Sequence, residues 1–451
     1  MADIGKIFLF GFEEPVISVE RLKFFKKIGA KYFILFKRNI EHLKENIDIL
    51  KNEFDNPIIS VDGEGGIVRR ISEFDDFMFS NMNLGSSFDP RYAKETYFKM
   101  GQILLEKGIN MNLAPVVDVY LTEGNTISIR SFGGFVDMVS EFSLNAIEGL
   151  HKAHVYAVAK HFIGYGGVKI DPHKTIPSFE LDYPYFEMAL KPFEAVKDVS
   201  DFIMTAHIIV PFIDDLPITF SKKGISLLRE FYKGPIMTDD LEMGGANVFP
   251  LEEIPVKALL AGNDMLSVCS LFEVQKTMVS AIEKSHINID EHIERIEGLR
   301  KFDDSNLEEI SLRNERFVTL YKDENFIGTK NFKFIVISSL KEHFGSKAFL
   351  HFSIEPNEDE KNNILSNLKS DDNVVITVYD AFNNPKQVEL VESIKRIVKN
   401  VCVIILGDPF DRQLFTFADC IVLTYSPLPK IVEVALNVVK GEYKAMGRLP
   451  V

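Results

Sequence analysis

Two segments of the chain combine residue types that can break a covalent bond. The segment KHFIGYGGVKIDPHKTIP, residues 160–177, carries Asp171 two positions before His173, and MTDDLEMGGA, residues 237–246, carries Asp239 after an apolar run. A carboxylate that orients one imidazole nitrogen leaves the other free to act as a general acid/base near neutral pH. An aspartate at the end of a strand is well placed to act as a nucleophile. These residues are candidates for an acid/base pair and a nucleophile.

Each candidate has a structural alternative. An isolated Asp-x-His pair is more often a solvated loop feature, but the position of this one beside Lys160 and His161 favours the catalytic interpretation. Asp240 follows Asp239 directly, so its side chain is expected to point away from that of Asp239, toward the start of a helix that it caps.

The segment SVDGEGGIVRR, residues 60–70, resembles a phosphate loop only superficially. Position 68 is valine where a GxGxxG pattern requires glycine, and Asp62 and Glu64 would repel phosphate. Paired carboxylates accept hydrogen bonds from the hydroxyl groups of a sugar. The matching hydrogen-bond donors are the basic side chains Arg70, Arg130, Lys160 and His161. Any one of them, taken singly, could instead be a structural ion-pair partner.

A metal centre is a second interpretation of the polar residues. His207 could join His161 and Asp239 as a ligand, but the chain has no HxH or HExxH pattern. Histidines scattered over a barrel are more often core or hydrogen-bonding residues. We therefore expect no metal site.

Short apolar runs must position these side chains. Eight such runs alternate with segments of helical periodicity in the first 300 residues, and this alternation predicts a parallel sheet. The runs cover residues 6–12, 31–36, 57–62, 111–119, 155–162, 201–208, 234–241 and 264–268. In a (β/α)8 barrel of the TIM type the carboxyl ends of the strands meet at one mouth, so the polar residues that end these runs would share a site.

The sequence predicts a second, smaller domain. After Arg300 apolar clusters become sparse, and a new βα alternation begins at residue 333, with apolar runs at 333–340, 373–380, 401–407 and 420–425. We expect a catalytic barrel over 1–305, a linker over 306–330 and an α/β sandwich over 331–451.

Composition limits the classes of partner and the compartment. The 451 residues include 51 Lys+Arg and 66 Asp+Glu, so the net charge of −15 disfavours a nucleic-acid or membrane-surface protein. The three cysteines lie in apolar segments without CxxC spacing, which favours a reducing, cytoplasmic setting. We expect neither a secretory leader nor a membrane helix.

Five segments, met in order along the chain, resemble the motifs of glycoside hydrolase family 3 in its β-N-acetylglucosaminidase branch. They are DGEGG (62–66), NLAPVVD (112–118), RSFG (130–133), KHFIGYG followed by DPH (160–166 and 171–173), and TDDLEM (238–243). Together they are highly specific. The chain departs from the family pattern at Gly63, Ile163, Tyr165 and Pro172.

The resemblance implies a fold, a reaction and a set of site residues. The expected enzyme removes a terminal, non-reducing β-linked N-acetylglucosamine from oligosaccharides or muropeptides, with retention of configuration. The resemblance makes Asp239 the nucleophile, His173 the general acid/base and Asp171 its partner. It implies that the terminal sugar is held by Asp62, Arg70, Arg130, Lys160 and His161. No cofactor is expected, and the partner is the carbohydrate substrate.

Three alternatives stay open at this stage. One is a sugar-binding or regulatory barrel without catalysis, and another is a metal-dependent hydrolase that uses His161, His207 and Asp239. The third is a β-N-acetylglucosaminide phosphorylase of the same family. The group attached to the terminal sugar and the contribution of the second domain to the pocket are not readable from the sequence.

Overall fold

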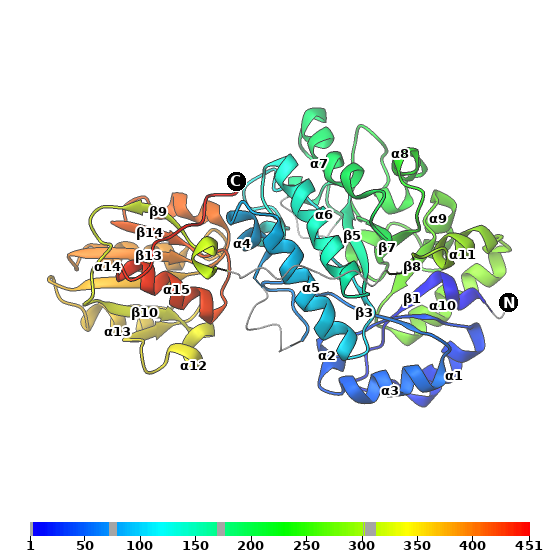
Figure 1. Cartoon of the computed structure of the whole chain (residues 1–451), viewed down its shortest axis with the longest axis horizontal. Helices are drawn as coiled ribbons and strands as arrows, with labels where there is room; N and C mark the ends of the chain where they lie inside the picture. Colours follow the sequence, from blue (N-terminus) through cyan, green and yellow to red (C-terminus); the bar gives the residue numbers. More distant parts are fainter. Residues whose placement is uncertain (1–2, 72–78, 169–175, 301, 303–312) are drawn as a thin grey trace.

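Two α/β units follow one another along the chain. The computed structural model describes residues 3–71, 79–168, 176–300, 302 and 313–451. In Figure 1 the first unit, coloured blue to green, lies on the right, and the second, yellow to red, lies on the left. The chain passes from one to the other once and returns at its end, where Gly134 N donates to the carbonyl of Pro450.

The first unit is a closed barrel of parallel strands in the order β1 to β8. The strands are β1 Phe8–Phe10, β2 Tyr32–Ile34, β3 Ile58–Val61, β4 Met111–Asn112, β5 Tyr156–Phe162, β6 Phe202–Thr205, β7 Ile236–Asp240 and β8 Met265–Val268. Each lies within one of the eight apolar runs, and the barrel closes by parallel pairing of β1 with β8. The predicted (β/α)8 barrel is therefore confirmed.

Helices surround the barrel. They are α1 Val19–Ile28, α2 Lys37–Ile40, α3 Leu43–Glu53, α4 Asn81–Ser86, α5 Arg91–Glu106, α6 Val136–Lys152, α7 Tyr183–Val196, α8 Lys222–Phe231, α9 Ile254–Ala261, α10 Phe272–Ser285 and α11 Asp290–Glu297. The strands are buried on both faces because the helices cover the outside while side chains fill the inside. In α6, for example, Val139, Phe142, Ala146 and Leu150 form one buried stripe at spacings of three and four.

The fourth strand is much shorter than its apolar run. Only Met111 and Asn112 pair as β4, although the run continues to Val119. Pro115 has no N–H to donate to a neighbouring strand, so the regular ladder ends before it. An isolated bridge from Val116 to Lys160 then keeps the segment beside β5.

The second unit is a six-stranded sheet in the order β11-β10-β12-β13-β14-β9. Its strands are β9 Thr319–Asp323, β10 Lys333–Ile337, β11 Leu350–Phe352, β12 Asn373–Val378, β13 Asn400–Ile405 and β14 Cys420–Leu423. Its helices are α12 Lys341–Phe344, α13 Glu358–Ser366, α14 Lys386–Lys395 and α15 Pro429–Val439. Strand β9 pairs antiparallel with β14. It lies inside the segment 306–330 that the sequence predicts to be a linker, so the sheet takes an edge strand from that segment.

Polar contacts join the two units. The hydroxyl of Tyr120 donates to the carboxylate of Asp408, with Oη 2.7 Å from Oδ2, and Ser80 Oγ donates to the carbonyl of Tyr425 at 2.7 Å. Figure 1 shows α4 at this junction, beside the second sheet. The contacts fix the loops of the second sheet beside the mouth of the barrel.

Within the described ranges, no helix is both long enough and apolar enough to cross a membrane.

Candidate active site

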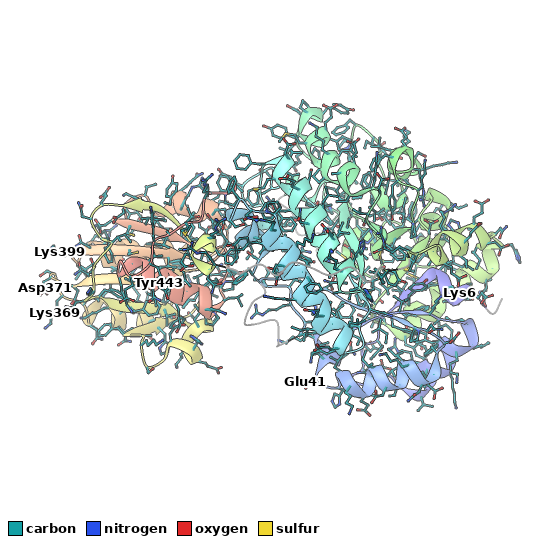
Figure 2. All side chains as sticks on the ribbon, in the orientation of Figure 1. Lys6, Glu41, Lys369, Asp371, Lys399 and Tyr443 are labelled. Atoms are coloured by element: carbon teal, nitrogen blue, oxygen red, sulfur yellow. The ribbon has the colours of Figure 1, made fainter. Side chains whose placement is uncertain are left out.

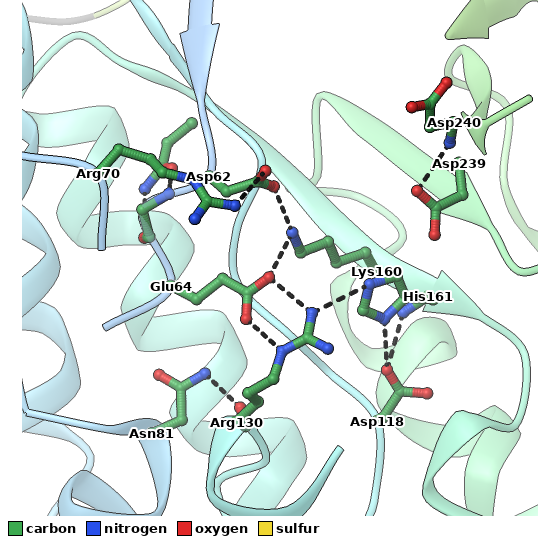
Figure 3. Close-up of polar contacts among 12 residues, drawn as sticks. Asp62, Glu64, Arg70, Asn81, Asp118, Arg130, Lys160, His161, Asp239 and Asp240 are labelled. Atoms are coloured by element: carbon green, nitrogen blue, oxygen red, sulfur yellow. Dashed lines mark hydrogen bonds and ion pairs between the residues drawn. The ribbon is translucent and has the colours of Figure 1, made fainter. Parts of the chain in front are cut away.

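The carboxyl ends of the barrel strands bring six of the predicted site residues to one cavity of about 1380 Å³. Its lining includes Asp62, which follows β3, Lys160 and His161 from β5, Asp239 from β7, Arg70 from a loop and Arg130 from a short 3-10 helix. Two further predicted residues, Asp171 and His173, lie outside the described residues. Figure 3 shows the carboxylate of Asp239 pointing toward the side on which Lys160 and His161 lie.

Glu64 forms the centre of an ion-pair network at the floor of the cavity. It is 2% exposed, and its carboxylate accepts from Arg130 Nε at 2.6 Å and from Arg130 Nη2 at 2.8 Å, as Figure 3 shows. Lys160 Nζ lies 2.5 Å from its Oε1. Burial opposes the charged form, but the charges of Arg130 and Lys160 outweigh it and hold the pKa of Glu64 well below its usual range. Glu64 thus fixes two cations, which corrects the expectation that its oxygens would accept from sugar hydroxyls.

Asp62 lies on the other side of Lys160. Its Oδ1 is 2.9 Å from Lys160 Nζ, and its Oδ2 is 3.4 Å from Arg70 Nη2. Burial again disfavours the carboxylate, yet these two cations lower the pKa of Asp62. The pKa of Lys160 is raised in turn, since the charges of Asp62 and Glu64 outweigh its burial. The site therefore offers charged donors and a charged acceptor side by side, the combination that binds vicinal hydroxyl groups.

His161 is oriented by Asp118, which ends the NLAPVVD segment. The carboxylate Oδ2 accepts from the backbone N–H of His161 at 3.0 Å and lies 2.9 Å from its Nδ1. Because a carboxylate only accepts, Nδ1 carries the proton, and Nε2 faces Arg130 Nη2 at 3.4 Å. The peptide bond between Lys160 and His161 is cis.

Asp239 and Asp240 end β7 and have different surroundings. Asp239 Oδ1 accepts from the backbone N–H of Asp240 at 2.8 Å. Asp240 Oδ1 accepts from the N–H groups of Glu242 and Cys269, at 3.1 and 3.2 Å. The prediction that Asp240 caps a helix is wrong, because the chain turns into a short 3-10 segment and the loop after β8 supplies a donor. Burial, with the charge of Glu242, raises the pKa of Asp240 to about 7.

His207 supports the backbone near Asp239. Its Nδ1 lies 2.8 Å from Thr219 Oγ1, and its Nε2 lies 3.0 Å from the carbonyl oxygen of Asp240. Burial lowers its pKa, so the ring is neutral near pH 7. Both nitrogens thus have protein partners. Among the residues that the structure describes, no group of three His, Cys, Asp or Glu could hold a metal ion.

The loop after β5 makes a close turn over the fourth strand segment. A Cβ on Gly166 would lie 1.7 Å from the carbonyl oxygen of Val119, so only glycine fits there. Tyr165, which stands where the family pattern has histidine, accepts from the N–H of His207 at 3.2 Å. Burial, with the nearby charge of Asp239, raises the pKa of Tyr165 well above its usual value. The hydroxyl therefore stays protonated beside the candidate nucleophile.

The second sheet supplies an outer wall that sequence reasoning missed. The loops after β12 and β13 line the same cavity through residues that carry no recognisable motif, among them Tyr379, Asp380, Phe382, Asp408 and Asp411. They reach it because the two units are docked. The one signal in the sequence that could have pointed to these lining residues is the excess of polar and aromatic residues directly after the apolar runs 373–380 and 401–407.

Comparison with known proteins places the chain among sugar-cleaving enzymes. The sequence profile of the glycosyl hydrolase family 3 N terminal domain matches residues 33–299. A β-hexosaminidase of Idiomarina loihiensis is 33% identical over 267 residues, which cover 56% of this chain and 81% of that protein. A β-hexosaminidase of Methylobacillus flagellatus is also 33% identical, over 253 residues that cover 52% of this chain and 72% of that protein. A glycoside hydrolase family 3 β-N-acetylglucosaminidase of Paenibacillus sp. str. FPU-7 shares the fold, with TM-score 0.85, 24% identity, and coverage of 100% of this chain and 98% of that one.

Proposed function

The chain belongs to glycosyl hydrolase family 3, and we therefore propose that it is a retaining exo-glycosidase for terminal, non-reducing β-linked N-acetylglucosamine. Its substrates would be oligosaccharides or muropeptides. The names of the matched relatives, β-hexosaminidase and β-N-acetylglucosaminidase, support the choice of an N-acetylated sugar.

One observation carries this proposal. Asp239 opens onto a cavity whose floor presents Asp62, Arg70, Arg130, Lys160 and His161, so a carboxylate nucleophile and donors for sugar hydroxyls share one space. Glu64 holds the guanidinium of Arg130 in place, and Asp118 holds the ring of His161. A pre-ordered floor of this kind fixes the sugar ring before the reaction begins, which reduces the entropic part of the barrier.

The proposed reaction has two steps. Asp239 attacks the anomeric carbon while His173, oriented by Asp171, protonates the departing oxygen, and a covalent glycosyl-enzyme forms. Water, deprotonated by His173, then attacks the same carbon and releases Asp239. Two displacements retain the anomeric configuration. Arg70, Arg130 and Lys160 hold the hydroxyl groups through both steps.

A panel of nitrophenyl β-glycosides tests the proposed function. We expect kcat/KM for the N-acetylglucosaminide to exceed that for the glucoside and the xyloside by at least about a hundredfold, since donors matched to one substituent reject sugars that lack it. Preference for the glucoside would overturn the choice of sugar, and no turnover of any glycoside would overturn the enzymatic function. Activity that persists after exhaustive chelation would exclude the metal-dependent alternative. Assays with and without phosphate separate hydrolysis from phosphorolysis.

We further propose a cytoplasmic location. Cys269, Cys402 and Cys420 are buried free thiols, and Cys402 lies directly opposite Cys420 on neighbouring strands.

A further inference from the structure

The part of the cavity beyond the ion-pair floor is bounded by two loops of the second sheet. The loop after β12 contributes Tyr379, Asp380, Phe382 and Asn383, and the loop after β13 contributes residues between 407 and 414. We infer that a substrate whose terminal sugar lies on the floor extends its remaining part toward this wall, which faces the floor across the same cavity. The wall is then the surface that a leaving group meets.

Phe382 is an exposed aromatic ring on a rigid turn. Its side chain is 67% exposed, yet Asp411, which is 2% exposed, holds the turn: Oδ2 accepts from Ala381 N at 2.8 Å and Oδ1 from Phe382 N at 3.1 Å. The ring reaches the barrel, because a Cβ on Gly124 would lie 3.7 Å from Phe382 Cε1. A fixed, water-exposed ring at the rim of a polar cavity provides an apolar face on which the C–H face of a sugar can pack.

The charged side chains that this wall can present are all acidic. Glu123 from the barrel and Asp380, Asp408 and Asp411 from the second sheet line it, and within the part of the chain that the structure describes its second-sheet residues include no lysine or arginine. The nearby Arg412 donates to the carbonyl of Pro409 and stacks on the rings of Tyr321 and Phe410.

These carboxylates already repel one another. Burial, together with the charges of Asp408 and Asp380, raises the pKa of Asp411 to about 7. The pKa values of Asp408 and Asp380 are raised as well, chiefly by burial. A further anion would add to this repulsion, whereas an uncharged group would not, and an ammonium group would relieve it.

We propose that these two loops bind the sugar on the leaving-group side of the scissile bond and select an uncharged or amine-bearing sugar over one that carries a carboxylate. Phe382 supplies the packing surface, and the Asp380, Asp408 and Asp411 side chains supply the charge filter. The proposal rests on the proposed function and narrows its substrate class: neutral or partly deacetylated chito-oligosaccharides are favoured over muropeptides, whose muramic acid bears a lactyl carboxylate.

Binding measurements test the charge filter without turnover. The ligands are disaccharides in which β-1,4-linked N-acetylglucosamine precedes glucosamine, N-acetylglucosamine, N-acetylmuramic acid or the methyl ester of N-acetylmuramic acid. Calorimetry on the Asp239→Asn protein should give Kd values at least tenfold higher for the muramic acid disaccharide than for its methyl ester, which is one methyl group larger and carries no charge. Equal Kd values for the acid and its ester would overturn the charge filter.

Two variants with matched controls test the residues. Asp380 has φ 51°, which asparagine tolerates, so the Asp380→Asn protein should fold. In this variant the ratio of the Kd for the muramic acid disaccharide to the Kd for its ester should be several-fold smaller than in the parent protein. Phe382→Ala should weaken every disaccharide about tenfold and leave N-acetylglucosamine itself unchanged. The controls are Asp371→Asn, at the far end of the second sheet in Figure 2, and Phe349→Ala, also exposed, and neither should change any Kd. If Asp380→Asn and Phe382→Ala left every Kd unchanged, the proposal that these loops bind the sugar on the leaving-group side would be overturned.

The two proposals fail separately. If the proposed function is wrong, the protein should turn over no nitrophenyl glycoside. The Kd values of the disaccharides can still be measured in that case. If the proposal for the two loops is wrong, the protein should cleave nitrophenyl N-acetylglucosaminide but bind the muramic acid disaccharide and its ester with equal Kd values.

Discussion

Tyr120 and Asp408 lie 288 positions apart in the chain and meet at the edge of the cavity. The hydroxyl of Tyr120 lies 2.9 and 2.7 Å from the two carboxylate oxygens, and Ser128 Oγ donates to the same carboxylate at 3.0 Å. The ring of Tyr120 also stacks on Phe410, with centroids 5.4 Å apart. One barrel residue thus contacts the loop after β13 through both its ring and its hydroxyl.

Tyr120→Phe should loosen this junction. Because the ring remains, the variant loses only a hydrogen bond to a charged group, for which we expect a loss of about 1.5–3 kcal/mol in the free energy of unfolding. Denaturant unfolding measures it. Tyr321→Phe, which removes a hydroxyl from a ring that is 49% exposed, is the control and should change stability little. Equal effects of both changes would contradict the role of the Tyr120 hydroxyl.

Asp239→Asn should abolish turnover of nitrophenyl N-acetylglucosaminide. Removal of the nucleophile prevents the glycosyl-enzyme, so we expect kcat to fall by at least about ten-thousandfold. With the unaltered enzyme, a 2-fluoro sugar with a good leaving group should leave a covalent adduct on the peptide that contains Asp239, detectable by mass spectrometry. An adduct on Asp240 or on no residue would contradict the assignment.

His173→Ala should separate substrates by their leaving groups. Nitrophenolate departs without protonation, whereas a sugar hydroxyl requires an acid, so kcat/KM should fall at least about a hundredfold more for a disaccharide than for the nitrophenyl glycoside. His154→Ala changes a histidine outside the cavity lining and should affect neither substrate. Equal losses on both substrate classes in His173→Ala would argue against the acid role.

Glu64→Gln should weaken sugar binding through Arg130 and Lys160. Loss of the charge leaves two cations with less compensation, and breaking a buried pair of this kind costs about 3–5 kcal/mol. We expect a higher KM and a lower Tm. Glu95→Gln removes another buried carboxylate, paired with Lys99 on α5 away from the cavity, and should lower Tm without raising KM. A KM for Glu64→Gln equal to that of the Glu95 variant would refute the positioning role.

The titration of Asp240 predicts a pH dependence of stability. Its pKa in the folded protein is about 7, while an unfolded aspartate titrates near 3.9. Between these values the folded state keeps a proton that the unfolded chain has released, so stability falls as pH rises from about 4 to 7, by at most about 4 kcal/mol and less where solvent screens the group. The unfolding free energy of Asp240→Asn minus that of the wild type should therefore increase from pH 5 to pH 8. Parallel curves would contradict the raised pKa.

The barrel was readable from the sequence because its signal is local. Each strand is a short apolar run, and residues such as Asp62 and Asp239 stand directly after or at the end of a run, where parallel strands converge. That convergence places Asp62, Lys160, His161 and Asp239 together, whereas Arg70 and Arg130 reach the floor from segments between the strands.

What the sequence did not reveal depends on contacts between distant parts of the chain. An acid at position 64 can accept from a sugar or from Arg130, and only the fold decides between them. Strand β9 was missed because it is an edge strand with mostly exposed side chains, so Thr319–Asp323 carry no continuous apolar pattern. The role of Phe382 depends on how the second sheet docks on the barrel, which no motif encodes.

The floor of the cavity belongs to the barrel, and its outer wall belongs to the second sheet. Lys160, His161 and Asp239 stand on barrel strands, where a substitution disturbs a packed core, while the residues that we propose to select the leaving group stand on two loops of the second sheet. If that proposal holds, exchange of those loops between relatives would change which leaving groups are accepted without altering the barrel residues around the scissile bond.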